Sequence, residues 1–264
     1  MSCSLLPPVL EARALRKSYG GVVAVAGLSL SVPRGQILAL IGPNGAGKST
    51  TFNLLTGHLS PDSGDVLLNG KSLAGLPPRR IWRMGVGRTF QVAATFGSMT
   101  VLENVQMGLI SAHNRYRALW PWAGALYRDQ AMTLLDLVGL GPLAPLPCAT
   151  LAYGDVKRLE LALALVNNPH VLLMDEPTAG MALAERESVM ELTVTLARQR
   201  TITVVFTEHD MDVVFRHADR VAVINRGTLL ADGTPDEVQQ NEQVRDVYLG
   251  RGATYGKQAP DAER

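Results

Sequence analysis

The sequence predicts an α/β fold whose core sheet is mostly parallel, and three observations lead to this prediction. Residues 36–41 form an almost continuous apolar run that stops at a glycine, as a strand buried on both faces does. Residues 171–175 repeat this pattern but end in an acidic residue, and a second acidic residue follows directly. Residues 48–58, which follow the first run, space their apolar side chains like one face of a helix.

The first 70 residues contain further strands separated by turns. Residues 9–15 and 22–32 have the β-rich composition of strands, and we expect residues 17–21 to form the turn between them. Residues 65–68 are another predicted strand, and the Asn69-Gly70 pair that follows favours a tight hairpin.

Helical signals dominate from about residue 88 to residue 166, where strand signals fade. We interpret this stretch as a helical lobe inserted into the α/β core. Beyond it the core resumes with alternating strands and helices. The predicted strands are 171–175, 201–207 and 220–225, and the predicted helices are 184–198 and one that begins near Asp210.

The length of 264 residues suits one large domain with an insertion. We predict a single domain over residues 1–250. Its core would comprise about 1–87 and 167–250, and its lobe about 88–166. Residues 251–264 are polar and without periodicity, so we expect a disordered tail.

The composition excludes several classes of protein. Hydrophobic residues make up 47% and charged residues 19%, which is typical of a folded globular chain. The net charge of +1 lacks the basic excess of most nucleic-acid-binding proteins. No apolar run reaches the roughly 18–20 residues that span a bilayer, and no signal peptide is recognisable at the N-terminus. A cytoplasmic protein is the default expectation.

A glycine-rich segment joins the strand 36–41 to the helix that follows it. It matches the phosphate-loop pattern GxxxxGK[ST], in which glycines let backbone N–H groups surround a phosphate. The helix N-terminus adds partial positive charge. Lys48 would contact the β- and γ-phosphates, and Ser49 would supply a hydroxyl ligand for Mg²⁺. The predicted nucleotide-binding residues are Gly42, Pro43, Asn44, Gly45, Ala46, Gly47, Lys48, Ser49 and Thr50.

Two carboxylates, Asp175 and Glu176, end the strand 171–175. The carboxyl edge of a parallel sheet is where α/β folds bind ligands, so we expect both beside the phosphate loop. Asp175 would hold Mg²⁺, directly or through water, and Glu176 is placed to polarise an attacking water. The Asn-Lys-x-Asp element that GTPases use for guanine is absent from the sequence, which argues against that class.

The order of these elements resembles the ATP-binding cassette family, the nucleotide-binding subunits of ABC transporters. Its most specific mark is the segment Leu151, Ala152, Tyr153, Gly154 and Asp155, which resembles the family's signature sequence, LSGGQ. The resemblance covers about residues 9–250 and implies a P-loop NTPase cassette with a mostly parallel core sheet, an antiparallel β-subdomain and an inserted helical lobe. It also implies that the signature opens a helix toward the γ-phosphate of an ATP held by a second subunit.

Other residues take family roles through this resemblance. Tyr19 resembles the aromatic residue that stacks on adenine, with an ordinary strand-end tyrosine as the alternative, and Val25 would pack beside the base. Gln91 resembles the glutamine that reaches Mg²⁺ and the attacking water from the seam between core and lobe. His209 resembles the switch histidine, with a helix-capping histidine as the alternative. The implied catalytic residues are Glu176, His209 and Gln91, and the implied Mg²⁺ contacts are Ser49, Gln91 and Asp175.

A finer resemblance is to the subgroup that imports branched-chain amino acids, other hydrophobic amino acids, amides and urea, and within it to the larger ATPase subunit. The segments that carry it are 87–91, 99–105, 115–128 and 227–250. It implies ATP hydrolysis coupled to transport of branched-chain or other hydrophobic amino acids across the inner membrane. The implied partners are a second cassette ATPase, identical or different, and permease subunits. A periplasmic solute-binding protein would act indirectly, and no nucleic acid is expected.

The same resemblance places the chain peripherally on the cytoplasmic side of the inner membrane. We expect the permease to dock in the groove between core and lobe, near residues 91–103. The mean hydropathy of +0.10 suits a chain with a partner-facing surface.

Four departures from the family pattern leave alternatives open. Ala152 replaces the signature serine, Val156 a glutamine, Leu163 an arginine, and Ala182 an acidic or amide residue that contacts the partner subunit. Ala152 and Ala182 keep open one alternative, a weakly hydrolysing regulatory subunit of a heterodimer. Further alternatives, independent of these departures, are a cassette ATPase for urea, an amide or lipopolysaccharide export, and a cassette without a channel that serves DNA repair, translation or cofactor assembly. The near-zero charge, the absence of a coiled coil and the single cassette argue against DNA repair and translation.

Overall fold

Two β-sheets and a helical lobe make up the described part of the chain, which is residues 8–89, 95–113 and 126–249 of a computed structural model. The larger sheet has six strands in the order β10-β9-β3-β8-β7-β6. Its strands from β9 to β6 run parallel, and β10 joins the edge antiparallel to β9. These strands are β3 (Ile37–Ile41), β6 (Val86–Thr89), β7 (Val171–Asp175), β8 (Thr203–Thr207), β9 (Arg220–Asn225) and β10 (Thr228–Gly233).

The second sheet is antiparallel and has the order β2-β1-β4-β5. Its strands are β1 (Pro8–Tyr19), β2 (Val22–Pro33), β4 (Ser63–Leu68) and β5 (Lys71–Ser72). Asn69 and Gly70 both have positive φ, the conformation of a type I′ hairpin turn, and they connect β4 to β5. The predicted hairpin is therefore confirmed.

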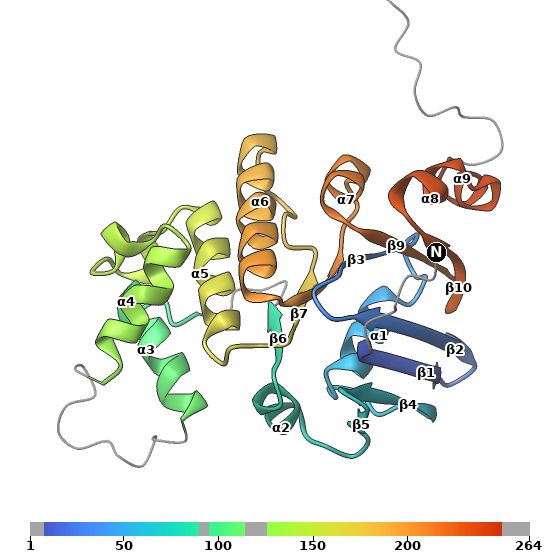
Figure 1. The fold of residues 1–264 in the computed structure, drawn as a ribbon, viewed down its shortest axis with the longest axis horizontal. Coiled ribbons are helices and arrows are strands. Elements are labelled where there is room, and N and C mark those ends of the chain that lie inside the picture. The colour runs from blue at the N-terminus through green and yellow to red at the C-terminus, as the bar shows by residue number, and fades with distance from the viewer. Residues whose placement is uncertain (1–7, 90–94, 114–125, 250–264) are drawn as a thin grey trace, which may run out of the picture.

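The helices divide into those that cover the sheets and those of the lobe (Figure 1). Around the sheets lie α1 (Lys48–Leu55), α2 (Pro78–Arg83), α6 (Leu183–Arg200), α7 (Met211–His217), α8 (Pro235–Gln240) and α9 (Glu242–Leu249). The lobe contains α3 (Val101–Ala112), α4 (Arg128–Leu137) and α5 (Tyr153–Leu165). Contacts of α5 with α3, α4, α6 and β6 attach the lobe to the β6 edge of the core.

Strand β3 shows why the apolar run 36–41 forms a buried strand. Side chains alternate between the two faces of a strand. Ile37, Ala39 and Ile41 belong to the cluster shared with the lobe and α6, whereas Leu38 and Leu40 belong to the cluster shared with α1 and the antiparallel sheet. Both faces are covered, so every residue of β3 must be apolar, and all five are buried.

The structure corrects several predicted boundaries. Lys17, Ser18 and Tyr19 belong to β1, and only Gly20 and Gly21 form the turn. Strand β6 extends to Thr89, two residues into the stretch expected to be helical lobe, because it pairs in parallel with β7. The prediction missed α2, β6, β10, α8 and α9, and the expected tail 251–264 lies outside the described residues.

Candidate functional site

The glycine-rich segment lies between the end of β3 and α1, as predicted. Gly45 and Gly47 have φ of 79° and 103°, in the left-handed region that favours glycine. A side chain on Gly47 would place a Cβ 2.4 Å from the carbonyl oxygen of Ala24, and one on Gly42 would lie 2.2 Å from that of Ile224. The loop is therefore pressed against β2 and β9, and its shape leaves no room for larger residues.

Lys48 begins α1 and folds back over the loop. Its Nζ donates hydrogen bonds to the carbonyl oxygens of Gly42, at 2.7 Å, and Pro43, at 3.2 Å. Burial lowers the pKa of Lys48, while the negative charges of Glu176 and Asp175 act in the opposite direction. The ammonium group thus lies within the electrostatic reach of both carboxylates.

The remaining loop residues differ in exposure. Asn44, Gly45 and Ser49 are exposed, and Pro43 and Thr50 are partly buried. Tyr19 lies 48% exposed at the end of β1, where its ring is open to a ligand. Val25 is fully buried in the core between the sheets, so its contact with a base stays a prediction.

The two acidic residues are held by one hydroxyl group. The register of β7 and β8 places Asp175 beside Thr207. The Thr207 Oγ1 donates to Asp175 Oδ1 at 2.8 Å and accepts the backbone N–H of Glu176 at 3.0 Å. Glu176 has φ of 49°, a conformation that non-glycine residues rarely adopt, and such strain gathers at functional sites.

Glu176 and His209 meet at the carboxyl edge of the sheet. His209 follows β8, and its Nε2 lies 2.9 Å from Glu176 Oε1. The ring is mostly exposed, with 52% of its side-chain surface accessible. A carboxylate paired with an exposed imidazole can orient a water and exchange a proton with it.

Three further residues support this edge, and the sequence interpretation missed all three as site residues. Thr207 is the hydroxyl described above. Arg88 on β6 lies 3.5 Å from Asp175 Oδ2 and donates to Asn53 of α1 and to Thr56, the residue that caps the end of α1. Glu208 is buried, and its Oε1 accepts from the backbone N–H and the hydroxyl of Thr178. The sequence did offer one signal for Thr207 and Glu208, because both are polar residues that directly precede the predicted site residue His209.

The signature segment opens α5, as the resemblance implied, within the stretch predicted as the lobe. Ala152 is the N-cap residue and provides no side-chain cap. The Tyr153 hydroxyl donates to the carbonyl oxygen of Ala179 at 3.1 Å, which ties the start of α5 to the segment after Glu176. Ala152 and Tyr153 are exposed, Leu151, Gly154 and Asp155 are partly buried, and α5 contacts the lobe, α6 and β6. The exposed helix start is therefore available to a second molecule.

Two other residues carry predictions that the described contacts do not test. Gln91 lies outside the described residues, two positions after the end of β6. Ala182 is the exposed N-cap residue of α6 and, like Ala152, provides no side-chain cap.

Oxygen donors suited to Mg²⁺ are present at the site. Mg²⁺ binds proteins through one or two carboxylates, with phosphate oxygens and waters completing its shell. The exposed hydroxyl of Ser49 and the carboxylate of Asp175 match this donor set. In the described residues, no three His, Cys, Asp or Glu side chains gather that could hold a metal ion by themselves.

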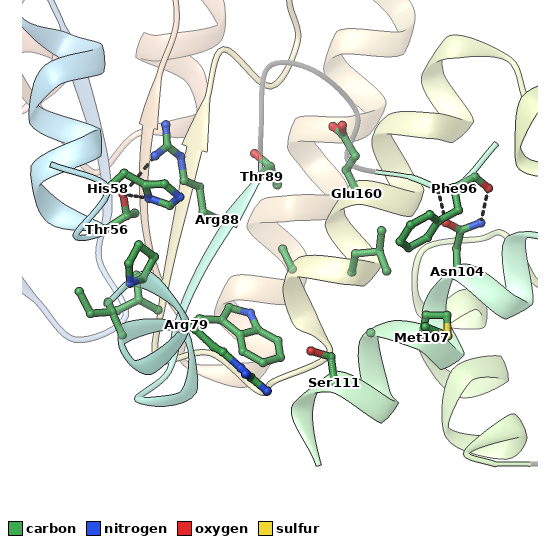
Figure 2. Close-up of a pocket in the computed structure, with 17 residues that line it drawn as sticks. Thr56, His58, Arg79, Arg88, Thr89, Phe96, Asn104, Met107, Ser111 and Glu160 are labelled. Carbon is green, nitrogen blue, oxygen red and sulfur yellow. Dashed lines mark hydrogen bonds between the residues drawn. The ribbon is translucent and has the colours of Figure 1, made fainter. Parts of the chain in front are cut away.

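A cavity of about 570 Å³ opens between core and lobe (Figure 2). Residues of α2 and β6 form its core side, and residues of α3 and α5 form its lobe side. The residues that line it include His58, Arg79, Arg88, Thr89, Glu160 and Leu163. Apolar residues such as Ile81, Trp82, Phe96 and Met107 line much of the remainder.

Comparisons with known proteins agree with the predicted family. The ABC transporter family model matches residues 25–179, and the model described as branched-chain amino acid ATP-binding cassette transporter matches residues 228–254. The high-affinity branched-chain amino acid transport ATP-binding protein LivG of Salmonella typhimurium is 40% identical over 253 residues, which cover 92% of this chain and 98% of that protein.

Solved structures give the same result. A crystal structure of the ADP conformation of an ATP-binding cassette from an ABC transporter has a TM-score of 0.83 at 30% identity, and covers 92% of this chain and 99% of that chain. A dimeric cassette in a post-hydrolysis state bound to ADP and Pi has a TM-score of 0.73 at 26% identity, with 86% and 98% covered. No helix in the described part of this chain is long and apolar enough to cross a membrane.

Proposed function

The chain belongs to the ABC transporter family, and from this premise we propose that it is the ATPase subunit of an importer that carries branched-chain amino acids across the inner membrane. The solute class is supported by the 40% identity to LivG, which extends over 98% of that protein. The separate C-terminal match at residues 228–254 supports the same subgroup.

Hydrolysis is assigned to Glu176 and His209, and their 2.9 Å contact is the observation that carries this proposal. Glu176 orients and polarises the water that attacks the γ-phosphate. His209 holds the Glu176 carboxylate and contacts the γ-phosphate through its exposed ring. Thr207 fixes Glu176 through the backbone, so the carboxylate needs little rearrangement before the reaction.

Nucleotide binding is assigned to the loop between β3 and α1. Its backbone N–H groups and the α1 N-terminus bind the β-phosphate, and Lys48 exchanges its carbonyl contacts for the β- and γ-phosphate oxygens. Tyr19 stacks on the adenine ring. Mg²⁺, when bound, would neutralise charge that develops on the phosphates, and Ser49 and Asp175 would hold it. Gln91 is proposed to reach the same metal and water.

A second cassette subunit would complete each site. The signature residues Leu151 to Asp155 start α5 in the lobe, and their exposed helix N-terminus suits a γ-phosphate bound by another subunit. Two subunits in head-to-tail contact would therefore enclose two ATP molecules. ATP binds the closed dimer more tightly than the open dimer, so ATP binding drives closure. Hydrolysis removes this preference and lets the dimer open again.

The membrane partners follow from the same assignment. Permease subunits would dock at the cavity between core and lobe, next to the predicted region 91–103, and hold the chain on the cytoplasmic side of the inner membrane. A periplasmic solute-binding protein would deliver the amino acid to those permeases.

Replacement of Glu176 by Gln tests the proposed chemistry. The variant keeps the shape of the side chain but removes the base, so we expect phosphate release to fall about a hundredfold or more while ATP binding persists. Glu191→Gln, the same change at an exposed position of α6, is the control and should hydrolyse ATP at the wild-type rate. Native turnover by Glu176→Gln would contradict the assignment.

A weakly hydrolysing partner subunit is the second candidate function. It is favoured by Ala152 and Ala182, which begin α5 and α6 without a side-chain cap or a polar group to offer a partner. ATP turnover of the chain alone, and then in complex with its transporter subunits, separates the two candidates. Turnover that stays near the background of Glu176→Gln in both preparations would favour the second.

A further inference from the structure

We propose that Glu160 and Thr89 form a polar recognition point within the core–lobe cavity, which accepts a lysine or arginine side chain of the docked membrane subunit. This inference rests on the proposed function, because it names the chemistry by which the docking cavity recognises its partner. It does not concern ATP binding or hydrolysis.

Glu160 is a buried carboxylate that is only half satisfied. It lies on α5 with 6% of its side chain exposed. Its Oε2 accepts from Lys157 Nζ at 3.0 Å, whereas its Oε1 is buried and has no hydrogen-bond partner within the described part of the chain. A buried acceptor without a partner costs about 1–3 kcal/mol, and more when it is charged.

Thr89 gives a second, independent indication. Its Oγ1 on β6 is also buried and unpartnered among the described residues, and Thr89 lines the same cavity as Glu160. Figure 2 shows Thr89 on the β6 strand of the core and Glu160 on the α5 helix of the lobe. Two buried polar atoms without partners, on separate elements whose residues line one cavity, indicate a polar occupant.

Among the described residues, no neighbour on α5 donates to the second carboxylate oxygen of Glu160. Leu163 lies one turn along α5, also lines the cavity, and offers no donor. Burial raises the pKa of Glu160, and the Lys157 contact only partly opposes this shift. A cation from outside the chain would therefore gain both a hydrogen bond and a charge partner.

The other charged groups of the cavity select where that cation enters. Arg88 is already paired with Asp175. Burial and the positive charge of Arg88 both lower the pKa of His58. The core side of the cavity therefore carries positive charge near β6. Arg79 adds positive charge on α2. This positive charge repels a basic residue of the permease and directs it to the α5 side of the cavity. The apolar residues of the cavity suit the apolar face of a short amphipathic segment of the permease.

The test uses the full chain co-expressed with the permease subunits of its transporter, one of them carrying an affinity tag. The amount of the chain retained per tagged permease is measured for wild type, Glu160→Gln and the control Glu191→Gln. Loss of a buried charge partner should reduce the affinity about tenfold or more for Glu160→Gln, and Glu191→Gln should match wild type. ATP binding by the isolated chain should be the same in all three.

Two results separate the inference from the proposed function. Equal retention of wild type and a folded Glu160→Gln overturns the recognition point but leaves docking at the cavity intact. Failure of the wild-type chain to be retained at all overturns the proposed docking and, with it, this inference.

A second variant covers the case in which Glu160→Gln does not fold. Leu163→Arg supplies a donor to Glu160 from within α5, so it should weaken retention about tenfold, whereas Leu163→Met, which is of similar size and uncharged, should not. Unchanged retention of Leu163→Arg overturns the inference.

A double-mutant comparison identifies the partner residue. Each basic residue in the cytoplasmic loops of the permease is replaced by alanine, alone and together with Glu160→Gln in the chain. At one position the two effects on retention should not be additive. Additivity at every position would also overturn the inference.

Discussion

At the scale of single residues, Thr207 organises the acidic end of the site. Its hydroxyl donates to Asp175 and accepts from the backbone of Glu176, so one side chain positions the proposed metal ligand and the proposed base. Asp175 also lies near Arg88, and Glu176 pairs with His209. Each carboxylate therefore has a separate cationic or imidazole neighbour, which suits two different roles.

Tyr19 is the residue whose proposed role can be tested most directly by binding. Its ring is 48% exposed, and stacking of a base on an aromatic ring is worth about 1–3 kcal/mol. We expect Tyr19→Ala to weaken ATP binding by about 5-fold to 150-fold, and Tyr19→Phe to bind like wild type. Fluorescent ATP-analogue titration measures both, and equal affinity of Tyr19→Ala and wild type would favour the strand-end alternative.

The raised pKa of Glu160 predicts how stability depends on pH. An acid whose pKa is raised above the ordinary 4.5 in the folded state holds its proton longer there, because burial disfavours the charged form. Its contribution to the free energy of unfolding is then fully present below about pH 4.5 and is lost as pH rises through the folded pKa.

The difference between wild type and Glu160→Gln isolates this effect. Lys157, Arg88 and His58 face Glu160 or its cavity and are the same in both proteins. We expect wild type to lose stability relative to the variant as pH rises from 4 toward neutrality, in urea unfolding at a series of pH values. Parallel curves across this range would show that the carboxyl titrates normally.

At the scale of elements, a capping box fixes the start of α3 in the lobe. Thr100 Oγ1 accepts from the backbone N–H of Glu103 at 3.1 Å, and the Glu103 carboxylate accepts from the N–H of Thr100 at 2.8 Å. The same helix supplies Asn104 and Met107 to the cavity. The cap therefore holds one wall of the proposed docking site.

Removal of this cap should weaken the lobe without changing the nucleotide site. Thr100→Ala is expected to lower the free energy of unfolding by about 1 kcal/mol, the usual value of an N-cap hydroxyl. Thr195→Ala, at an exposed position inside α6, is the control and should cause no loss. Urea unfolding followed by circular dichroism measures both. A cap variant as stable as wild type would mean that packing alone sets the start of α3.

At the scale of the whole molecule, the chain carries two separate halves of a nucleotide site. The loop, Asp175 and Glu176 lie at the carboxyl edge of the parallel strands, whereas the signature begins α5 in the lobe. In the proposed dimer, each site would combine the first half of one subunit with the second half of the other.

Mixtures of inactive variants test this arrangement. Lys48→Ala removes the phosphate contact, and Gly154→Asp places a negative charge in the signature. The isolated chain can pair only with itself, so a mixed dimer of these variants keeps one intact site. We expect the equimolar mixture to recover about a quarter of wild-type turnover, because half of the dimers are mixed and each has one of two sites.

The matched control mixes Lys48→Ala with Glu176→Gln. Both residues would serve the same half of the site, so every combined site contains a defect and no activity should return. Recovery in the control, or none in the first mixture, would contradict the shared-site arrangement. Phosphate release at saturating ATP is the measurement.

The local elements of the fold and the family can be predicted from the amino-acid sequence alone. The glycine loop, the buried strands β3 and β7 and the start of α5 each depend on residues that are adjacent in the chain, so their patterns are visible without a structure. The resemblance carried by the signature is confirmed by the family model and by LivG. The alternation of β3 between two cores also follows from its uninterrupted apolar run.

Contacts between residues that are distant in the chain depend on how the elements pack and could not be predicted. Strand β6 is four residues long and contains a glycine and an arginine, so its sequence does not indicate a strand, and its pairing with β7 makes it one. That pairing brings Arg88 to Asp175, the β7–β8 register brings Thr207 to both acids, and the packing of α5 on β6 places Glu160 and Thr89 in one cavity. These contacts join segments far apart in the chain, and their stability comes from packing rather than from local sequence preference.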